Sequence, residues 1–250
     1  MAKCKRSAAR ALQWLLNEGT KVAAVVAGEP DDFTVDEQRV DLVAKRHGLT
    51  LASYEELSAA PPADVDLVIS FLFWKRIREP ILSLGRIGCL NFHPAPLPDI
   101  RGLGGYNVAV LEGMTAWGVS CHFVDADLDT GDLVEVERFP IDAESSTALS
   151  VDIESQEHMF GLFQRVMRRV LAGEELAREP QGQGRYVGQD EFEALRRVQP
   201  GDDLDRKLRA FWYPPYPGAV IEVAGRELTL VDDRLLREAA QAYRDAGHVP

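Results

Sequence analysis

The stretch from Cys89 to Asp132 constrains the fold more than any other part of the chain. It begins as a strand, predicted over residues 87–92, and continues into a proline- and glycine-rich loop over residues 94–105, whose composition excludes regular structure. A second strand is predicted over residues 117–124, and an aspartate-rich turn follows it over residues 125–132. We therefore expect the end of the first strand and this turn to meet at one edge of a sheet.

Polar side chains sit at both ends of this arrangement. Residues two apart on a strand point the same way, so Asn91 and His93 are expected to face one cleft. The turn supplies Asp127, Asp129 and Asp132. This set of groups suits acyl transfer. The amide can stabilise an oxyanion, the imidazole can move a proton, and the carboxylate can keep the imidazole in position.

The motifs of this stretch resemble those of the formyltransferases that use 10-formyltetrahydrofolate. The resemblance covers roughly the first two-thirds of the chain and a further stretch near Trp212. The matching pieces, in the family's order, are Asn91-Phe-His93, Leu97-Pro98, Arg101-Gly102, His122-Phe-Val124 and Asp129-Thr-Gly131. The resemblance implies that 10-formyltetrahydrofolate is the co-substrate.

The resemblance also implies the catalytic residues. The family's N-x-H and D-x-G motifs fall on Asn91, His93 and Asp129. Asp127 and Asp132 compete with Asp129, but only Asp129 stands before Thr-Gly, as the motif requires. His122 lies in a predicted strand and is expected to have a structural or supporting role.

Two loops are implied to hold the folate. The first follows the predicted strand 67–71, and the second leads into the D-x-G turn. The residues concerned are Phe71, Phe73, Trp74, Lys75, Asp125 and Asp127. The competing interpretation is that the aromatic residues are core, although consecutive bulky apolar residues cannot all face one side of a strand.

The C-terminal part of the sequence restricts the class of acceptor substrate that we expect. Arg209-Ala-Phe211 and the loop Pro214 to Ala219 are similar to the segment after the catalytic domain in sugar-nucleotide N-formyltransferases. We accordingly predict a nucleotide-sugar substrate held by Arg101, Gly102, Tyr106 and Trp212. For Arg101 two roles stay open, a contact with a substrate phosphate and an anchor for its own loop. For Tyr106 and Trp212, stacking on the substrate competes with ordinary packing.

The predicted fold is α/β, a Rossmann-like doubly wound, mostly parallel sheet with a small C-terminal α+β appendage. The catalytic domain is expected over residues 1–180 and the appendage, a helix and a hairpin, over residues 181–250. An amphipathic helix is predicted over residues 7–18 and buried strands over 21–27 and 67–71. The family's fold opens with a strand before its first helix, and that strand is apparently missing here.

Composition limits the partners. The net charge of −12 argues against nucleic acid, whose phosphates need basic residues, and residues 1–20 do not form a signal peptide. Three cysteines without C-x-x-C spacing favour a reduced, cytoplasmic setting and no metal. No apolar run reaches the length of a membrane span. The sequence is compatible with a homodimer.

Other functions stay open at this point. The acceptor could instead be another small amine, such as glycinamide ribonucleotide or an amino acid. Water could replace the amine, which would make the chain a hydrolase. Without the first strand, the chain could also be an inactive protein that binds folate or nucleotide. Binding without product would separate this last case from the enzymes.

Overall fold

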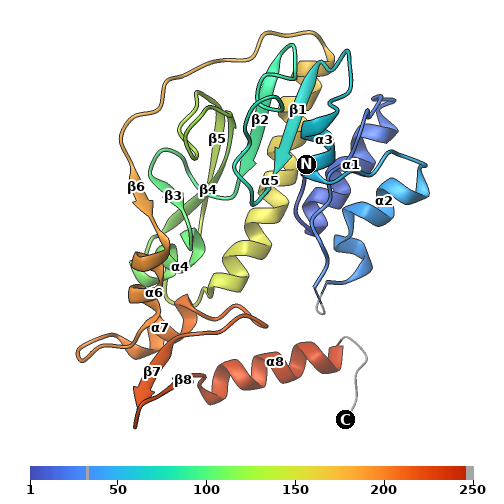
Figure 1. Ribbon diagram of the computed structural model, residues 1–250. Helices are drawn as coiled ribbons and strands as arrows, with labels where there is room; N and C mark the ends of the chain where they lie inside the picture. Colours follow the sequence, from blue (N-terminus) through green and yellow to red (C-terminus); the bar gives the residue numbers. More distant parts are fainter. Residues whose placement is uncertain (32–33, 246–250) are drawn as a thin grey trace. The chain divides into compact units, whose positions relative to one another are not determined.

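The computed structural model describes residues 1–31 and 34–245 (Figure 1). They form two compact units, each assembled from separate parts of the chain. The first unit comprises Met1–Gly102, Gly118–Phe139 and Ile153–Tyr186, and the second comprises Leu103–Trp117, Pro140–Asp152 and the chain from Val187 onwards. The helices are α1 (Arg6–Asn17), the 3-10 helix η1 (Asp36–Gln38), α2 (Val40–Arg46), α3 (Tyr54–Ala59), α4 (Gly105–Leu111), α5 (Ala148–Leu171), α6 (Gln189–Arg196), α7 (Leu204–Ala210) and α8 (Asp233–Asp245). The strands are β1 (Leu67–Phe71), β2 (Gly88–His93), β3 (Ile100–Gly102), β4 (Ala116–Phe123), β5 (Leu133–Pro140), β6 (Arg185–Val187), β7 (Val220–Val223) and β8 (Arg226–Thr229).

The first unit is built on a sheet with the strand order β1-β2-β4-β5. β1 and β2 are parallel, with Leu67 opposite Gly88, whereas β2 and β4 are antiparallel, with Asn91 opposite His122. The predicted α/β class is therefore confirmed, and parallel pairing is found on the β1 side of β2. The sequence did not lead us to expect β5, whose residues are only partly buried. The expectation that residues 94–105 contain no regular structure is wrong at Ile100–Gly102, where the short strand β3 pairs with β6.

Helices cover both faces of this sheet. On one face, Phe163 of α5 packs edge-on against Phe71 and Phe92, with ring centroids 5.7 and 5.0 Å apart, and Figure 1 shows α5 running along these strands. On the other face, Leu57 of α3 packs against a cluster that includes Val68. Because β1 is buried on both faces, its sequence is an apolar run and does not alternate between apolar and polar residues.

The expected strand over residues 21–27 is only partly formed. It pairs through isolated parallel bridges, Val25 with Leu51 and Ala27 with Ala2. Lys21 is exposed and Val22 is half-buried. The prediction of a fully buried strand is therefore wrong before Val25, because the pairing of this segment with Leu51 and with Ala2 begins only at Val25 and Val26.

The second unit contains α4, α6, α7, α8 and the hairpin β7–β8, which the sequence predicted around residues 224–226. The side-chain amide of Asn107 in α4 donates to the carbonyl of Ala210 in α7 at 2.8 Å. Phe192 and Phe211 pack with ring centroids 5.7 Å apart. These contacts give the unit its own small core.

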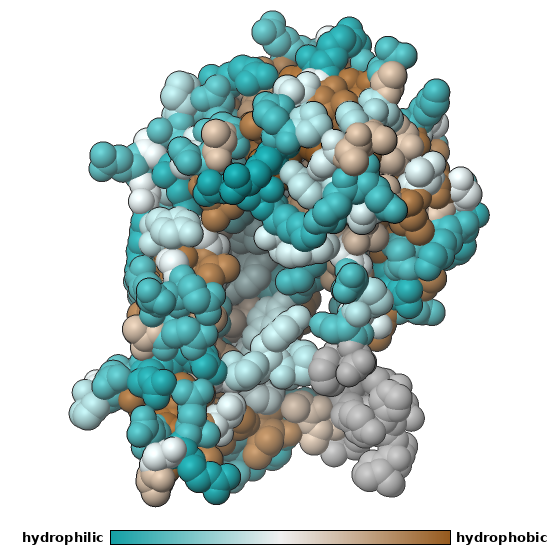
Figure 2. All heavy atoms as spheres, in the orientation of Figure 1, coloured by the Kyte–Doolittle hydropathy of each residue, from teal (hydrophilic) through white to brown (hydrophobic). Residues whose placement is uncertain are grey.

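The surface is mainly hydrophilic on the face shown in Figure 2, where teal side chains separate smaller brown groups. This distribution agrees with the charged-residue content of 27%. None of the helices that the structure describes is long and apolar enough to cross a membrane.

Candidate active site

The neighbouring strands β2 and β4 set up the site. Their antiparallel register places Asn91 directly opposite His122 and His93 directly opposite Ser120. Directly opposed residues point to the same face of a sheet. The two strands thus bring Asn91 and His122 into contact, although they lie far apart in the sequence.

The side-chain amide of Asn91 is held from both sides. Its Oδ1 accepts a hydrogen bond from Ser70 Oγ at 2.7 Å, and its Nδ2 lies 3.0 Å from Nε2 of His122. The Nδ1 of His122 lies 2.7 Å from the carbonyl oxygen of Phe123. That oxygen can only accept, so Nδ1 carries the proton and Nε2 accepts from Asn91. An amide has two N–H donors, which leaves the second one for another acceptor.

His122 stays neutral in this setting. It is 2% exposed, and burial together with the neighbouring His93 lowers its pKa to about 4. The carboxylate of Asp129 opposes this shift but does not outweigh it. A neutral His122 is required for the hydrogen bond from Asn91, because a protonated ring would have no acceptor nitrogen.

Asp129 places its carboxylate between two imidazoles. Its Oδ1 lies 3.6 Å from Nδ1 of His93 and 3.8 Å from Nε2 of His122. These separations are too long for direct hydrogen bonds. Asp129 has φ of 56°, a left-handed conformation that aspartate tolerates better than most residues. The structure therefore brings together the predicted residues Asn91, His93 and Asp129.

The turn that carries Asp129 is fixed by a residue that the sequence analysis missed. The Nε2 of Gln181 donates to the carbonyl oxygens of Asp129, at 3.2 Å, and Gly131, at 2.6 Å. At Gly131 a Cβ atom would lie 2.0 Å from the carbonyl oxygen of Phe123, so only glycine fits. The segment that carries Gln181 thus packs on the turn of Asp129. The side chains of this segment show no pattern from which its contact with the turn could have been predicted.

Arg101 also serves this turn. Its Nη2 donates to Oε1 of Gln181 at 3.1 Å and to the carbonyl oxygen of Gly182 at 2.8 Å. The loop-anchoring role, one of the two left open for Arg101, is the one these contacts support. Its neighbour Gly102 ends β3 with φ of 85°.

A small cavity of about 40 Å³ lies beside these side chains. That volume holds a water molecule but not a folate. Its lining includes the polar groups described above and both predicted folate loops. The lining residues are Ser70, Phe73, Lys75, Arg76, Ile77, Asn91, His122, Val124, Asp125, Asp127, Leu128 and Asp129.

The residues predicted for folate divide into two groups. Phe73, Lys75, Asp125 and Asp127 line the cavity, as expected for side chains at the ends of strands. Phe71 does not, and its prediction needs correction, because this side chain is 2% exposed and stacks in the core.

Three of the residues predicted to contact folate, Trp74, Lys75 and Asp125, also have partners within the protein. Trp74 is 51% exposed, outside the cavity lining, and its ring lies against Phe73 with a centroid distance of 4.6 Å. Lys75 pairs with Glu55 at 2.9 Å. Asp125 accepts from Oγ1 of Thr130 at 2.7 Å and thereby closes the turn before Asp129.

Two predicted substrate residues belong to the second unit. The ring of Tyr106 packs against Trp117, with centroids 6.1 Å apart. Trp212 is half-buried, and its carbonyl oxygen accepts from the amide of Leu149 at 3.1 Å. Packing therefore accounts for the Tyr106 ring, and the backbone of Trp212 is held within the same unit. A role of either side chain in substrate binding stays a prediction.

Ser70 is the other functional residue that the sequence analysis missed. A signal was present, since Ser70 is the single polar residue in the apolar strand Leu67–Phe71.

Within the described residues, no three histidine, cysteine, aspartate or glutamate side chains gather in a way that could hold a metal ion.

Comparison with known proteins identifies the family model for formyl transferases, which matches residues 17–166. Among curated proteins, the chain is 29% identical over 238 residues to the methionyl-tRNA formyltransferase of Dechloromonas aromatica. This match covers 89% of this chain and 75% of that protein. It is 28% identical over 175 residues to the GDP-perosamine N-formyltransferase of Brucella melitensis. This match covers 65% of this chain and 63% of that protein.

Among solved structures, the chain is similar to an N-formyltransferase from Helicobacter canadensis, determined with folinic acid and dTDP-3-aminofucose. The TM-score is 0.72 at 18% identity, and the match covers 90% of this chain and 83% of the other. At this identity the likeness confirms the fold.

Proposed function

Because this chain belongs to the formyl transferase family, we propose that it transfers a formyl group from 10-formyltetrahydrofolate to the primary amine of a nucleotide-linked amino sugar. The observation that carries the chemistry is the amide of Asn91, fixed by Ser70 and His122 with one N–H left over. An immobilised donor of this kind costs no reorganisation when an oxyanion forms, which is the main requirement for stabilising acyl-transfer intermediates.

In the proposed mechanism, the nitrogen of the amine attacks the formyl carbon, and the carbonyl electrons move to oxygen. Asn91 donates a hydrogen bond to the oxyanion. His93 accepts the proton that the amine loses and, once protonated, also donates to the oxyanion. Asp129 orients His93. Collapse of the intermediate breaks the bond to N10 of the folate, and N10 takes the proton from His93.

Asp129 is proposed to act on His93 and on the reacting atoms through water. The separation of 3.6 Å between Asp129 and His93 is too long for a direct hydrogen bond. The adjoining cavity of about 40 Å³, which Asp129 and Asn91 both line, has room for one water molecule. Tetrahydrofolate is proposed to bind along the loops with Phe73 and Asp125, which would have to part to admit it.

A nucleotide-sugar acceptor is supported by two features of the chain. The net charge of −12 does not favour a polyanion such as tRNA. In the second unit, Tyr216 is 51% exposed and its ring lies beside that of Tyr213, which leaves an exposed aromatic ring of the kind on which bases stack. We propose that catalysis resides in residues 1–180 and that residues 181–250 contribute to acceptor binding.

Methionyl-tRNA is the second candidate acceptor, because the curated relatives include several methionyl-tRNA formyltransferases that match most of this chain. Glycinamide ribonucleotide is a third. A common assay with 10-formyltetrahydrofolate can separate these three acceptors.

The experiment incubates the enzyme with 10-formyltetrahydrofolate and each acceptor, and reads the formyl mass gain. The panel contains nucleotide-linked amino sugars, the matching free amino sugars, glycinamide ribonucleotide and methionyl-tRNA, with Asn91→Ala as the background control. We expect product with a nucleotide-linked sugar and far slower reaction of the free sugar, since the remote nucleotide helps to position the amine. Product with methionyl-tRNA alone would contradict the proposal, and binding of folate without any product would favour an inactive binding protein.

A further inference from the structure

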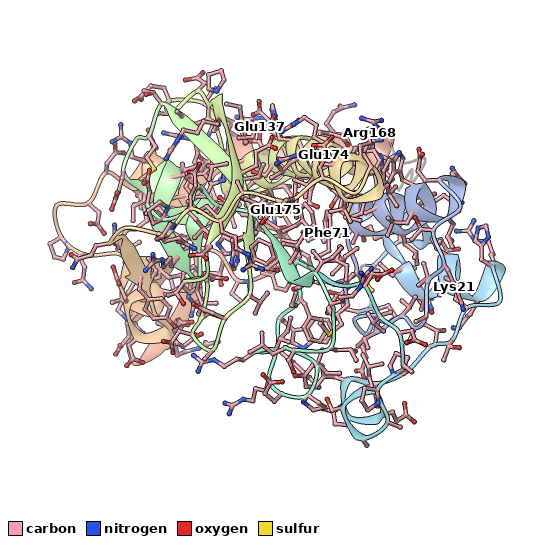
Figure 3. All side chains as sticks on the ribbon, turned by 90° about the horizontal axis from the view of Figure 1, so that it is seen from above. Lys21, Phe71, Glu137, Arg168, Glu174 and Glu175 are labelled. Carbon is pink, nitrogen blue, oxygen red and sulfur yellow. The ribbon has the colours of Figure 1, made fainter. Side chains whose placement is uncertain are left out.

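The loop that follows β1 carries three cationic side chains close together, those of Lys75, Arg76 and Arg78. We call residues 73–78 the cationic loop. It begins shortly after Phe71, which ends β1 and is labelled in Figure 3. This concentration of positive charge runs against the net charge of −12 of the whole chain. The mechanism proposed above gives these cations no role.

The cationic loop is held in a defined conformation by its backbone and its apolar side chains. The hydroxyl of Tyr54 in α3 accepts a hydrogen bond from the amide of Arg78 at 2.9 Å, and the Tyr54 ring lies against Phe73 with a centroid distance of 5.8 Å. Ile77 is buried in the core of the first unit. Arg76 and Arg78, on either side of Ile77, are exposed. The loop therefore presents both guanidinium groups on a fixed backbone.

The three cations differ in whether a carboxylate of the protein already neutralises them. The Nζ atom of Lys75 lies 2.9 Å from Oε1 of Glu55. Arg76 and Arg78 form no ion pair with residues 1–31 or 34–245. Both guanidinium groups are thus available to an anion from outside the protein. A guanidinium is well suited to a carboxylate, which it can bind through two parallel hydrogen bonds.

The small cavity beside Asn91 is lined by two loops of opposite charge. The cationic loop contributes Lys75 and Arg76, and the turn before the D-x-G motif contributes Asp125 and Asp127. A folate has a matching polarity, because its pterin end is rich in N–H donors and its other end carries carboxylates. The carboxylate end is therefore attracted to the cationic loop and repelled by the aspartates of the turn.

The two arginines follow one another along a path that leads out of the cavity. Arg76 lines the cavity, whereas Arg78 lies two residues farther along the loop and outside the lining. A folate tail that leaves the cavity past Arg76 meets Arg78 next. Each glutamate added to that tail through a γ-linkage brings one further carboxylate, farther from the pterin. The successive cations of the loop thus match the successive anions of such a tail.

We propose that Arg76 and Arg78 bind the carboxylates of a γ-linked glutamate chain on the folate, so that the protein prefers folates with several glutamates to the form with one. This inference rests on the proposed function, because it concerns the co-substrate of the same site. The positive side chains also speed the encounter with an anionic ligand. Arg76 and Arg78 therefore select the co-substrate and take no part in the chemistry at Asn91.

Binding measurements test this proposal without turnover. The probes are 5-formyltetrahydrofolate with one glutamate and the same compound with three γ-linked glutamates. Isothermal titration calorimetry gives the Kd of each, and the readout is the ratio of the Kd for the monoglutamate to that for the triglutamate. Because the pterin and the first glutamate are common to both probes, this ratio isolates the added carboxylates.

The proteins compared are the parent, Arg76→Glu, Arg78→Glu and the control Lys21→Glu. Lys21 is exposed, forms no ion pair within the part of the chain that the structure describes, and lies apart from Phe71 in Figure 3. All three substitutions change the net charge of the protein by the same amount. A melting curve for each variant verifies that it is folded.

We expect the parent to bind the triglutamate about fivefold more tightly than the monoglutamate at low salt, as two exposed ion pairs would give. The ratio should fall towards one at high salt, where such pairs are screened. Arg76→Glu and Arg78→Glu should each bring the low-salt ratio below about two, whereas Lys21→Glu should keep the parental ratio.

A ratio near one in the parent, with both probes bound, would overturn this inference and leave the proposed folate site intact. A preference for the triglutamate that either arginine variant retains would also overturn it, since the added carboxylates would then be bound elsewhere. So would an equal loss of preference in Lys21→Glu, which would reduce the effect to net charge. If the folded parent binds neither probe, the proposed function fails, and this inference fails with it.

Discussion

The Nδ2 atom of Asn91 donates to Nε2 of His122 across the β2–β4 pair, at 3.0 Å. This bond fixes the tautomer of His122 and the orientation of Asn91 together, because the other nitrogen of His122 is committed to the carbonyl oxygen of Phe123. The donor proposed for the oxyanion is thus aimed by buried neighbours that do not themselves touch the substrate. Removing those neighbours should change turnover more than binding.

Ser70→Ala tests this positioning role. The variant loses the hydrogen bond at 2.7 Å to Oδ1 of Asn91, so the amide can rotate away from its catalytic orientation. We expect turnover to fall about tenfold with little change in KM, because a misplaced group loses transition-state stabilisation but not ground-state binding. The measurement is a steady-state assay alongside a melting curve.

Ser7→Ala is the matched control for Ser70→Ala. Ser7 is also buried, and its hydroxyl donates to the side-chain oxygen of another amide, Gln156, on α5. Both variants should lose about 1 kcal/mol of stability, but only Ser70→Ala should lose turnover. Equal turnover losses would mean that the effect on Ser70 is a general loss of stability.

The pH dependence of stability should report on His122. Its pKa is lowered from 6.5 to about 4 by burial, so between these values the unfolded chain binds a proton that the folded chain does not. Stability should therefore fall as the pH drops from about 6.5 to 4, by up to about 3 kcal/mol from this group. The α-amino group of Met1, with a pKa lowered to about 6, contributes mainly at higher pH, between 8 and 6.

His122→Gln isolates this contribution. Glutamine does not titrate, so the variant should have a flatter stability curve between pH 4 and 6.5, whatever its stability at pH 7. Urea unfolding at half-unit pH steps measures the slope. A slope equal to that of the parent would show that other groups, such as the paired carboxylates, dominate acid unfolding.

The sequence was informative where a residue's role depends on its own strand or turn. Asn91 and His93 could be placed on one face because two-residue spacing on a strand expresses local geometry, whereas Asp129 was selected among three aspartates by its resemblance to the family's D-x-G motif. The helix over residues 6–17, predicted over residues 7–18, likewise follows from local periodicity.

The contacts between distant segments could not be found in this way. Gln181 reaches the turn of Asp129 from a segment without any periodic pattern. Phe71 was assigned to the folate site because the family it resembles binds folate at the loop that begins there, yet strand alternation turns it into the core against Phe92 and Phe163. Such choices depend on which strands pair, and a single sequence does not contain that information.

Asn91→Ala and His93→Ala should each lower turnover by about a hundredfold or more, the usual effect of removing one oxyanion donor. Both variants should retain the parental circular dichroism spectrum. The double variant should be little worse than the more damaged single variant, because groups that act as a unit are not additive. Near-parental turnover of His93→Ala would contradict the proposed mechanism.

Arg101→Ala distinguishes the two roles of Arg101. If it acts by anchoring Gln181 and Gly182, turnover should fall by a similar factor, about threefold to tenfold, with every acceptor that reacts. Gln181→Ala should then reproduce the effect. A rise in KM confined to nucleotide-linked acceptors, with unchanged turnover, would instead assign the guanidinium to a substrate phosphate.

Asp129 allows the chemistry of the site to be separated from the conformation of its turn. With φ of 56°, position 129 favours asparagine at least as well as aspartate and penalises alanine. Asp129→Asn should therefore keep the melting temperature within about 2 °C of the parent, while turnover falls about a hundredfold or more, because the carboxylate that couples to His93 is gone. Asp129→Ala should lose both turnover and stability, since the left-handed conformation costs it about 1 kcal/mol. Paired melting curves and single-turnover assays measure the two effects. If Asp129→Asn were fully active, the carboxylate would have no part in catalysis and the residue would serve only the turn; if it were as unstable as Asp129→Ala, the charge itself would be what holds the turn together.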